Sequence, residues 1–137
     1  MAPSSSLKVD SREPDVLTPD ERLADALALV RDDPLAYVML MFPWDSEPSI
    51  QVDDLAHGAE ERMTPADRER RNAYRARFPG CKYGPDLWAC DLLDDLGREI
   101  RKRAFDGRSP VMPIRFATVS GHGIGKSTMA AWLIKFI

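Results

Sequence analysis

The sequence predicts an α/β fold that is mostly helical, with a single strand near the C-terminal end of the chain. Segments between residues 18 and 106 carry helix-start signals or apolar residues at helical spacing. A β-branched and aromatic run follows at residues 114–119, and a glycine-rich stretch and an apolar helix come directly after it. Because one strand cannot form a sheet by itself, we expect the sheet to be incomplete.

Length and composition are those of one modest globular domain. The chain has 137 residues, of which 44% are hydrophobic and 30% are charged, and one hydrophobic core typically serves about 100–150 residues. The net charge of −3 hides an asymmetry: residues 1–60 hold 4 basic and 13 acidic side chains, whereas residues 61–137 hold 15 basic and 9 acidic ones. Such an asymmetry hints at an interaction surface.

Cysteine and histidine usage argues against a disulfide framework and against a zinc site. The two cysteines are Cys81 and Cys90, and the two histidines are His57 and His122. Their spacing does not fit the four ligands of a closed zinc site. The N-terminus lacks an apolar signal core, and no stretch has the length of a membrane span. We therefore expect a cytoplasmic protein that does not contact a membrane.

The first half of the chain predicts a leader and two helices. Residues 1–17 are rich in serine, proline and charge, and we expect a flexible leader. Residues 18–21, Thr-Pro-Asp-Glu, combine a capping box with proline at the first helical position, and leucines at helical spacing follow. The apolar run at 35–42 predicts a second, buried helix that Pro43 ends, and residues 45–63 are expected to be mostly loop.

Two more helices are predicted before the strand. Thr64-Pro65 repeats the cap-plus-proline pattern ahead of the arginine-rich residues 68–77. The clearest helix then follows and ends at Asp106-Gly107. Its apolar positions recur at i+4 steps, so we expect them to face the core; they are Trp88, Leu92, Leu96 and Ile100, with Leu93 beside them.

The stretch from 120 to 128, Ser-Gly-His-Gly-Ile-Gly-Lys-Ser-Thr, carries the clearest chemistry. A strand, a glycine-rich loop, Lys-Ser and a helix form the order of a Walker A loop, so the fold class predicted is that of a P-loop NTPase. The glycines let the backbone curl around phosphates, and the helix adds its positive dipole end. Candidate cofactor-binding residues are Gly121, His122, Gly123, Ile124, Gly125, Lys126, Ser127 and Thr128.

Within this loop, Lys126 is expected on the β- and γ-phosphates of ATP, and the hydroxyl of Ser127 is expected to ligate Mg²⁺. The first position of the motif is Ser120 rather than glycine. The alternative for the whole stretch is an ordinary glycine-rich strand-to-helix turn. His122 either touches phosphate or a partner or is simply tolerated in an exposed loop. No acidic Mg²⁺ partner (Walker B) and no residue that activates water is identified, so no catalytic residue is predicted.

Two other groups of residues allow two interpretations each. The arginines from Arg68 to Arg77, with Lys82, form either a nucleic-acid-binding patch or a solvated helix face with acidic residues interspersed. Trp44, after Pro43, is either a packing anchor or a contact to adenine, and packing is favoured.

Three features in this order resemble the N-terminal part of the large subunit of tailed-phage terminases. They are Pro43-Trp44 after an apolar helix, Gly84-Pro85-Asp86-Leu87-Trp88 at the start of an amphipathic helix, and the loop from Ser120 to Ser127. The resemblance covers residues 34–137. Many relatives carry glutamine directly after the tryptophan, where it can help to read adenine; here Ala89 follows Trp88, so this role is not carried over.

The resemblance implies the front part of a phage DNA-packaging ATPase that binds ATP and Mg²⁺. For the full-length protein it implies double-stranded DNA, the small terminase subunit and the portal as partners, in the host cytoplasm. The chain then divides into the leader 1–17, a helical segment 18–110, and the first strand, Walker A loop and helix of a truncated ATPase domain at 111–137. Such a fragment is expected not to be catalytic alone.

Two alternatives remain open. The chain is either part of another nucleic-acid-directed P-loop ATPase, of the helicase or AAA type, or a non-catalytic truncated product that acts as an interaction module. In the last case the acidic residues 1–60 would dock a basic partner.

Overall fold

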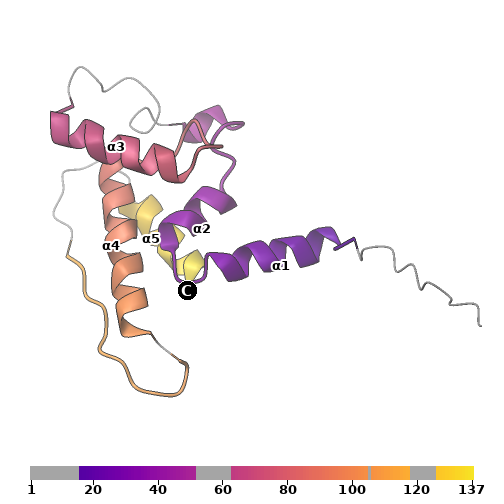
Figure 1. The fold of residues 1–137 in the computed structure, drawn as a ribbon. Helices are drawn as coiled ribbons and strands as arrows, with labels where there is room; N and C mark the ends of the chain where they lie inside the picture. The colour runs from indigo at the N-terminus through magenta and orange to yellow at the C-terminus, as the bar shows by residue number, and fades with distance from the viewer. Residues whose placement is uncertain (1–15, 52–62, 105, 118–125) are drawn as a thin grey trace, which may run out of the picture.

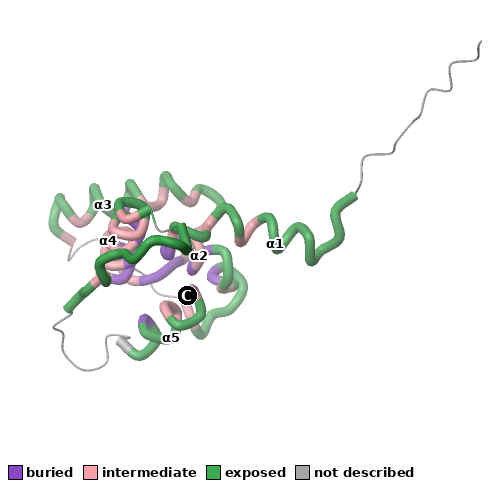
Figure 2. The backbone as a smooth tube through the Cα atoms, turned by 90° about the horizontal axis from the view of Figure 1, so that it is seen from below, coloured by how far each residue is buried: buried purple, intermediate pink, exposed green. Residues whose placement is uncertain are grey.

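Five α-helices dominate the computed structural model, which describes residues 16–51, 63–104, 106–117 and 126–137 (Figure 1). The helices are α1 (Pro19–Leu29), α2 (Pro34–Met41), α3 (Pro65–Arg77), α4 (Leu87–Arg103) and α5 (Lys126–Phe136), with a 3₁₀ turn at Pro48–Ile50. Helix α2 lies at the centre, because it packs against both α4 and α5, while α3 packs against α4. Helix α1 extends away from this body, and none of its residues is buried (Figure 2).

The predicted capping box at Thr18 and the predicted cap at Thr64 are both confirmed. The hydroxyl of Thr18 accepts a hydrogen bond from the backbone N–H of Glu21 at 3.3 Å, and the Glu21 carboxylate accepts one from the backbone N–H of Thr18 at 2.7 Å. Thr64 and Asp67 repeat this exchange at the start of α3, at 3.2 Å in each direction. The N–H of Thr18 holds the pKa of the Glu21 carboxyl below its ordinary value, because the bond favours the ionised form. Both helices therefore begin where the sequence predicts.

The core is formed where α4 crosses α2. Leu35 and Val38 of α2 and Cys90 and Leu93 of α4 are at most 1% exposed. The two helices approach closely at Gly97, where an added Cβ would lie 3.2 Å from Cδ of Pro34. The missing side chain at Gly97 thus makes room for the first turn of α2.

The prediction of which face of α4 is buried is wrong by about one residue. The buried positions are Leu87, Ala89, Cys90, Leu93 and Gly97. Leu93, predicted beside the i+4 series, is buried, whereas Trp88, Leu92, Leu96 and Ile100 are only half-buried and flank this stripe. Ala89, Cys90 and Gly97 are small, so a search for large apolar residues overlooks them, and at Gly97 the absence of a side chain permits the close contact with Pro34. Helix α4 also ends at Arg103, before the predicted Asp106-Gly107, and Ala104 adopts a left-handed conformation with φ 46°.

The predicted α/β fold of the P-loop NTPase type is wrong for the part of the chain that the structure describes. These residues form helices and contain no strand and no sheet. Of the predicted strand, residues 114–117 belong to neither a helix nor a strand, and residues 118 and 119 lie outside the described ranges. A strand is stabilised by the hydrogen bonds that a neighbouring strand supplies. Just before this segment, the hydrogen bond to the backbone comes from a side chain and not from a neighbouring strand: Nε of Arg103 donates to the carbonyl of Met112 at 2.8 Å.

Replacing Leu93 tests the core. We expect Leu93→Ala to lower the free energy of unfolding by about 2–5 kcal/mol, because the side chain is 0% exposed and its loss leaves a cavity between α4 and α2. Leu29→Ala is the matched control: Leu29 is 86% exposed on α1, so the expected change is within about 0.5 kcal/mol. Urea unfolding followed by tryptophan fluorescence measures both. Equal effects of the two substitutions would contradict this core.

Candidate functional site

The predicted phosphate-binding residues lie mostly outside the described part of the chain. Residues 121–125, which are Gly121, His122, Gly123, Ile124 and Gly125, fall in the gap before α5. Lys126 is the first residue of α5, and Ser127 and Thr128 follow in its first turn, where both are exposed. The predicted helix behind the loop is therefore confirmed, and it starts at the lysine of the motif.

A pocket opens beside this first turn of α5. Its volume is about 260 Å³. Three segments that are distant in the sequence line it: the chain after α2, the start of α4, and α5. The lining residues are Phe42, Trp44, Ser49, Ile50, Pro85, Asp86, Trp88, Ala89, Thr128 and Trp132. The chain has three tryptophans, and all of them contribute to this one pocket.

Aromatic rings form one wall of the pocket. The ring centroids of Phe42, Trp44 and Trp132 lie 5.8–5.9 Å from one another, with tilted or edge-on geometry. Trp44 is 4% exposed, and its indole N–H donates to the carbonyl of Val38 at 3.1 Å. The favoured packing role of Trp44 is thereby confirmed. Trp132 and Trp88 are half-buried, so part of each ring remains accessible from the pocket.

Asp86 is the charged residue of the pocket, and the sequence analysis did not single it out. It occupies the N-cap position of α4, yet its side chain makes no capping hydrogen bond there. Its carboxylate instead accepts a hydrogen bond from the indole N–H of Trp88 at 3.2 Å. The sequence Gly84-Pro85-Asp86-Leu87-Trp88 shows only an acidic residue at the start of a helix, where it reads as a cap. Only the fold reveals that Asp86 lines a pocket and makes no capping bond.

Two helices begin at this pocket. Asp86 precedes the first residue of α4, and Thr128 is the third residue of α5, and both line the pocket. The N-terminal ends of helices carry unpaired N–H groups and a partial positive charge. This arrangement favours an anionic group next to the aromatic wall, and the Asp86 carboxylate at the start of α4 is one such group.

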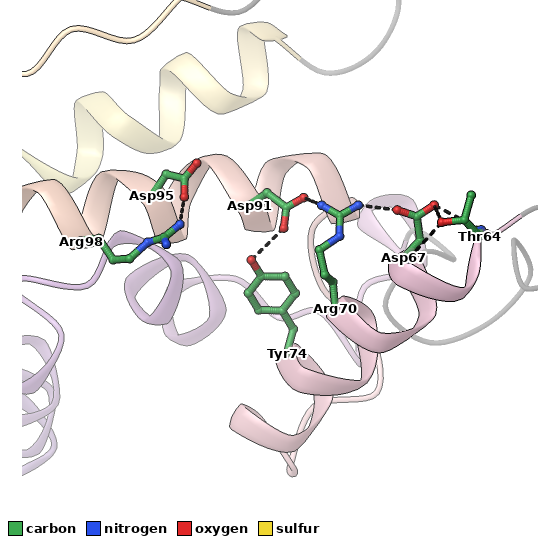
Figure 3. Close-up of polar contacts among 7 residues, drawn as sticks. All are labelled: Thr64, Asp67, Arg70, Tyr74, Asp91, Asp95 and Arg98. Carbon is green, nitrogen blue, oxygen red and sulfur yellow. Dashed lines mark hydrogen bonds and ion pairs between the residues drawn. The ribbon is translucent and has the colours of Figure 1, made fainter.

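The arginines of α3 are used largely in contacts within the protein. Arg70 forms ion pairs with Asp67 and with Asp91 of α4, and the hydroxyl of Tyr74 donates to Asp91 at 2.9 Å (Figure 3). Burial and this hydrogen bond both raise the pKa of Tyr74. These contacts join α3 to α4, which neither of the two sequence interpretations anticipated.

Arg77 extends the same network at the end of α3. It forms an ion pair with Asp33, before α2, and a second one with Asp94 of α4 at 2.8 Å. Burial lowers the pKa of Arg77, but the two carboxylates outweigh that effect and raise it above its ordinary value. Arg77 therefore connects three helical segments, and Arg71, on the same helix, is only 3% exposed.

Comparison with known proteins found no matching family model, no similar curated protein and no similar solved structure. Among the described residues there is no group of three or more histidine, cysteine or acidic side chains that could hold a metal ion. Within the same residues, no helix is both long and apolar enough to cross a membrane.

A substitution of Arg77 tests the ion-pair network. We expect Arg77→Gln to lower the free energy of unfolding by about 1 kcal/mol or less, because the pairs with Asp33 and Asp94 are partly exposed to solvent. The loss should shrink in about 1 M salt, which screens partly exposed charges. Arg22→Gln, on the exposed helix α1, is the control and should leave the unfolding midpoint unchanged. If both variants unfold alike at low salt, Arg77 does not connect the helices.

Proposed function

We propose that the chain binds the phosphates of a nucleoside triphosphate, ATP with Mg²⁺, through residues 120–128. This is the role that the resemblance to the front part of a phage terminase large subunit implies. The single observation that carries the proposal is the aromatic pocket of about 260 Å³ that adjoins Thr128 in the first turn of α5. A phosphate motif followed at once by a helix, with a place for a flat base beside that helix, suits a nucleotide.

The chemistry of the first turn of α5 fits both parts of the ligand. Ser127 is exposed, so its hydroxyl is accessible to a Mg²⁺ ion carried by the phosphates. Oxygen ligands from the phosphates and from water complete such a site, so a cage of protein carboxylates is not required. Lys126 is the first residue of this helix, and its ammonium group would supply a positive charge to the phosphates.

Binding rather than catalysis is the proposed activity of these residues. A bound triphosphate is hydrolysed only when a further group activates water, and no such group is assigned in this chain. Double-stranded DNA, the small terminase subunit and the portal are proposed as partners of the longer protein to which such a front part belongs, and the host cytoplasm is its proposed location.

Lys126→Ala is the direct test. We expect it to weaken Mg-ATP binding about tenfold or more, because a charge-assisted contact to phosphate is lost. Lys135→Ala is the matched control: it removes the same charge from the last turn of the same helix and should leave the affinity unchanged. Isothermal titration calorimetry with Mg-ATP measures both affinities. Indistinguishable affinities of the two variants would overturn the proposal that the segment before α5 holds phosphates.

A further inference from the structure

We propose that helix α1 of one chain docks on the basic face of a second copy of the same chain. The basic face consists of residues 98–104 and 106–117, which form the last turns of α4 and the segment after it. Each copy offers α1 to one neighbour and its basic face to another, so the contact is head-to-tail. It uses none of the residues that line the aromatic pocket, and the inference therefore goes beyond the proposed function and does not rest on it.

Helix α1 lacks the packing from which short helices gain their stability. It has 11 residues, and none of them is buried. Isolated helices shorter than about 12–15 residues are marginal in water, and most helices in proteins are stabilised by an apolar face that packs against another element. Leu23 is 47% exposed, and Leu27 lies one turn further on the same face. A surface that covers these two leucines would supply the missing packing.

The basic face carries positive charges that the rest of the described chain does not neutralise. Residues 98–117 include six basic and two acidic side chains. The two acidic ones are engaged locally, because Glu99 pairs with Arg103, and Asp106 accepts a hydrogen bond from the backbone N–H of Ser109 at 2.8 Å. Three exposed basic side chains form no ion pair with another described residue: Lys102, Arg108 and Arg115. This face therefore attracts an acidic surface.

Helix α1 and its flanking residues match the basic face in charge and in apolar character. Residues 16–30 hold three acidic side chains and one basic one, and Asp20 lies on the same face of the helix as Leu23. On the basic face, Phe116 is 45% exposed and lines, with Lys102, a hollow of about 460 Å³ beside α4. Leu23 can therefore contact the ring of Phe116 while Asp20 approaches a basic side chain.

The two surfaces lie on different sides of one chain. Figure 1 shows the start of α1 pointing away from the body, whereas the segment after α4 lies beyond α4 on the other side. Nε of Arg103 donates to the carbonyl of Met112 at 2.8 Å and so holds that segment against α4. Matching surfaces that face in different directions on one molecule can meet between two copies.

The presence of both surfaces on one chain favours a second copy over a nucleic acid as the partner. A nucleic acid would neutralise the basic face but would leave the leucines of α1 exposed, whereas a second copy covers both. A helix of 11 residues is about 16 Å long, so the contact buries less than the roughly 1,200 Å² typical of a stable complex. The contact is accordingly weak, and its charged part makes it sensitive to salt.

The test measures the mass of the full chain in solution without nucleotide. We expect sedimentation equilibrium to show an average mass that rises above that of the single chain between about 10 μM and about 1 mM, the range in which weak complexes form. Raising the salt from about 0.05 M to about 0.5 M should weaken the association about tenfold, because salt screens the attraction between exposed charges. An average mass that stays at that of the single chain, or association that salt leaves unchanged, would overturn the proposal.

Two substitutions, one on each surface, give the decisive comparison. Leu23→Lys places a positive charge on α1, where lysine is a good helix former, and Lys102→Glu places a negative charge on the basic face. Each should weaken the association about tenfold or more. Mixed in equal amounts, the two variants should associate as pairs with the native affinity, because α1 of the Lys102→Glu chain meets the unchanged basic face of the Leu23→Lys chain.

Matched variants control for a change of charge alone. Leu29→Lys introduces the same charge on another face of α1, and Lys135→Glu reverses an exposed charge on α5; both should associate like the native chain. Arg115→Glu lies outside the helices, so it should repeat the effect of Lys102→Glu without altering α4. Unchanged far-UV circular dichroism spectra verify that the variants are folded.

Three outcomes of this comparison contradict a head-to-tail contact. Folded single variants that associate like the native chain would overturn it, and so would an equal mixture of Leu23→Lys and Lys102→Glu that stays monomeric. If the native chain is monomeric and binds a short DNA duplex that Lys102→Glu no longer binds, the basic face belongs to a nucleic acid and the proposal is overturned.

Discussion

Trp44 connects the parts of the protein on which the pocket depends. Its indole N–H donates to the carbonyl of Val38 in α2 at 3.1 Å, and its ring contacts Trp132 of α5 with a centroid distance of 5.8 Å. The ring is almost completely buried, so these contacts stabilise the fold at a place from which water is excluded. Pro43 ends α2 immediately before Trp44 and so fixes where the ring lies. Together with the contact of Phe42 to the ring of Trp132, this contact holds α5 against the segment that follows α2.

Local signals in the sequence predict most of the helices. Threonine, proline and an acidic residue three positions on start α1 and α3 because these groups satisfy backbone donors that a helix leaves unpaired. The buried face of α4 was harder to predict from the sequence. Gly97 is buried because it leaves space for Pro34, and not because it is hydrophobic. The prediction of a strand before α5 was wrong for the described residues 114–117. β-branched residues favour an extended chain, but they cannot supply the neighbouring strand with which it must pair.

The candidate site was predictable only where it is local. The motif ending at Thr128 is contiguous, and the sequence predicts a helix directly behind it. In the structure this helix starts earlier, at Lys126. The pocket beside it is assembled from the chain after α2, from α4 and from α5, so its lining depends on tertiary packing. The same holds for α3, whose arginines resemble a nucleic-acid patch in the sequence but reach carboxylates of Asp91 and Asp94 in the fold.

The central claim is that base and phosphates of one nucleotide occupy adjoining places at the start of α5. Nuclear magnetic resonance of the ¹⁵N-labelled chain tests it most directly, because the backbone amides of Ser127 and Thr128 and the three tryptophan indoles give separate signals. On titration with Mg-ATP, the account predicts that these amides and the indoles of Trp88 and Trp132 shift together with one common dissociation constant. Amide shifts without any response of the indoles, or no shift in either group, would contradict it.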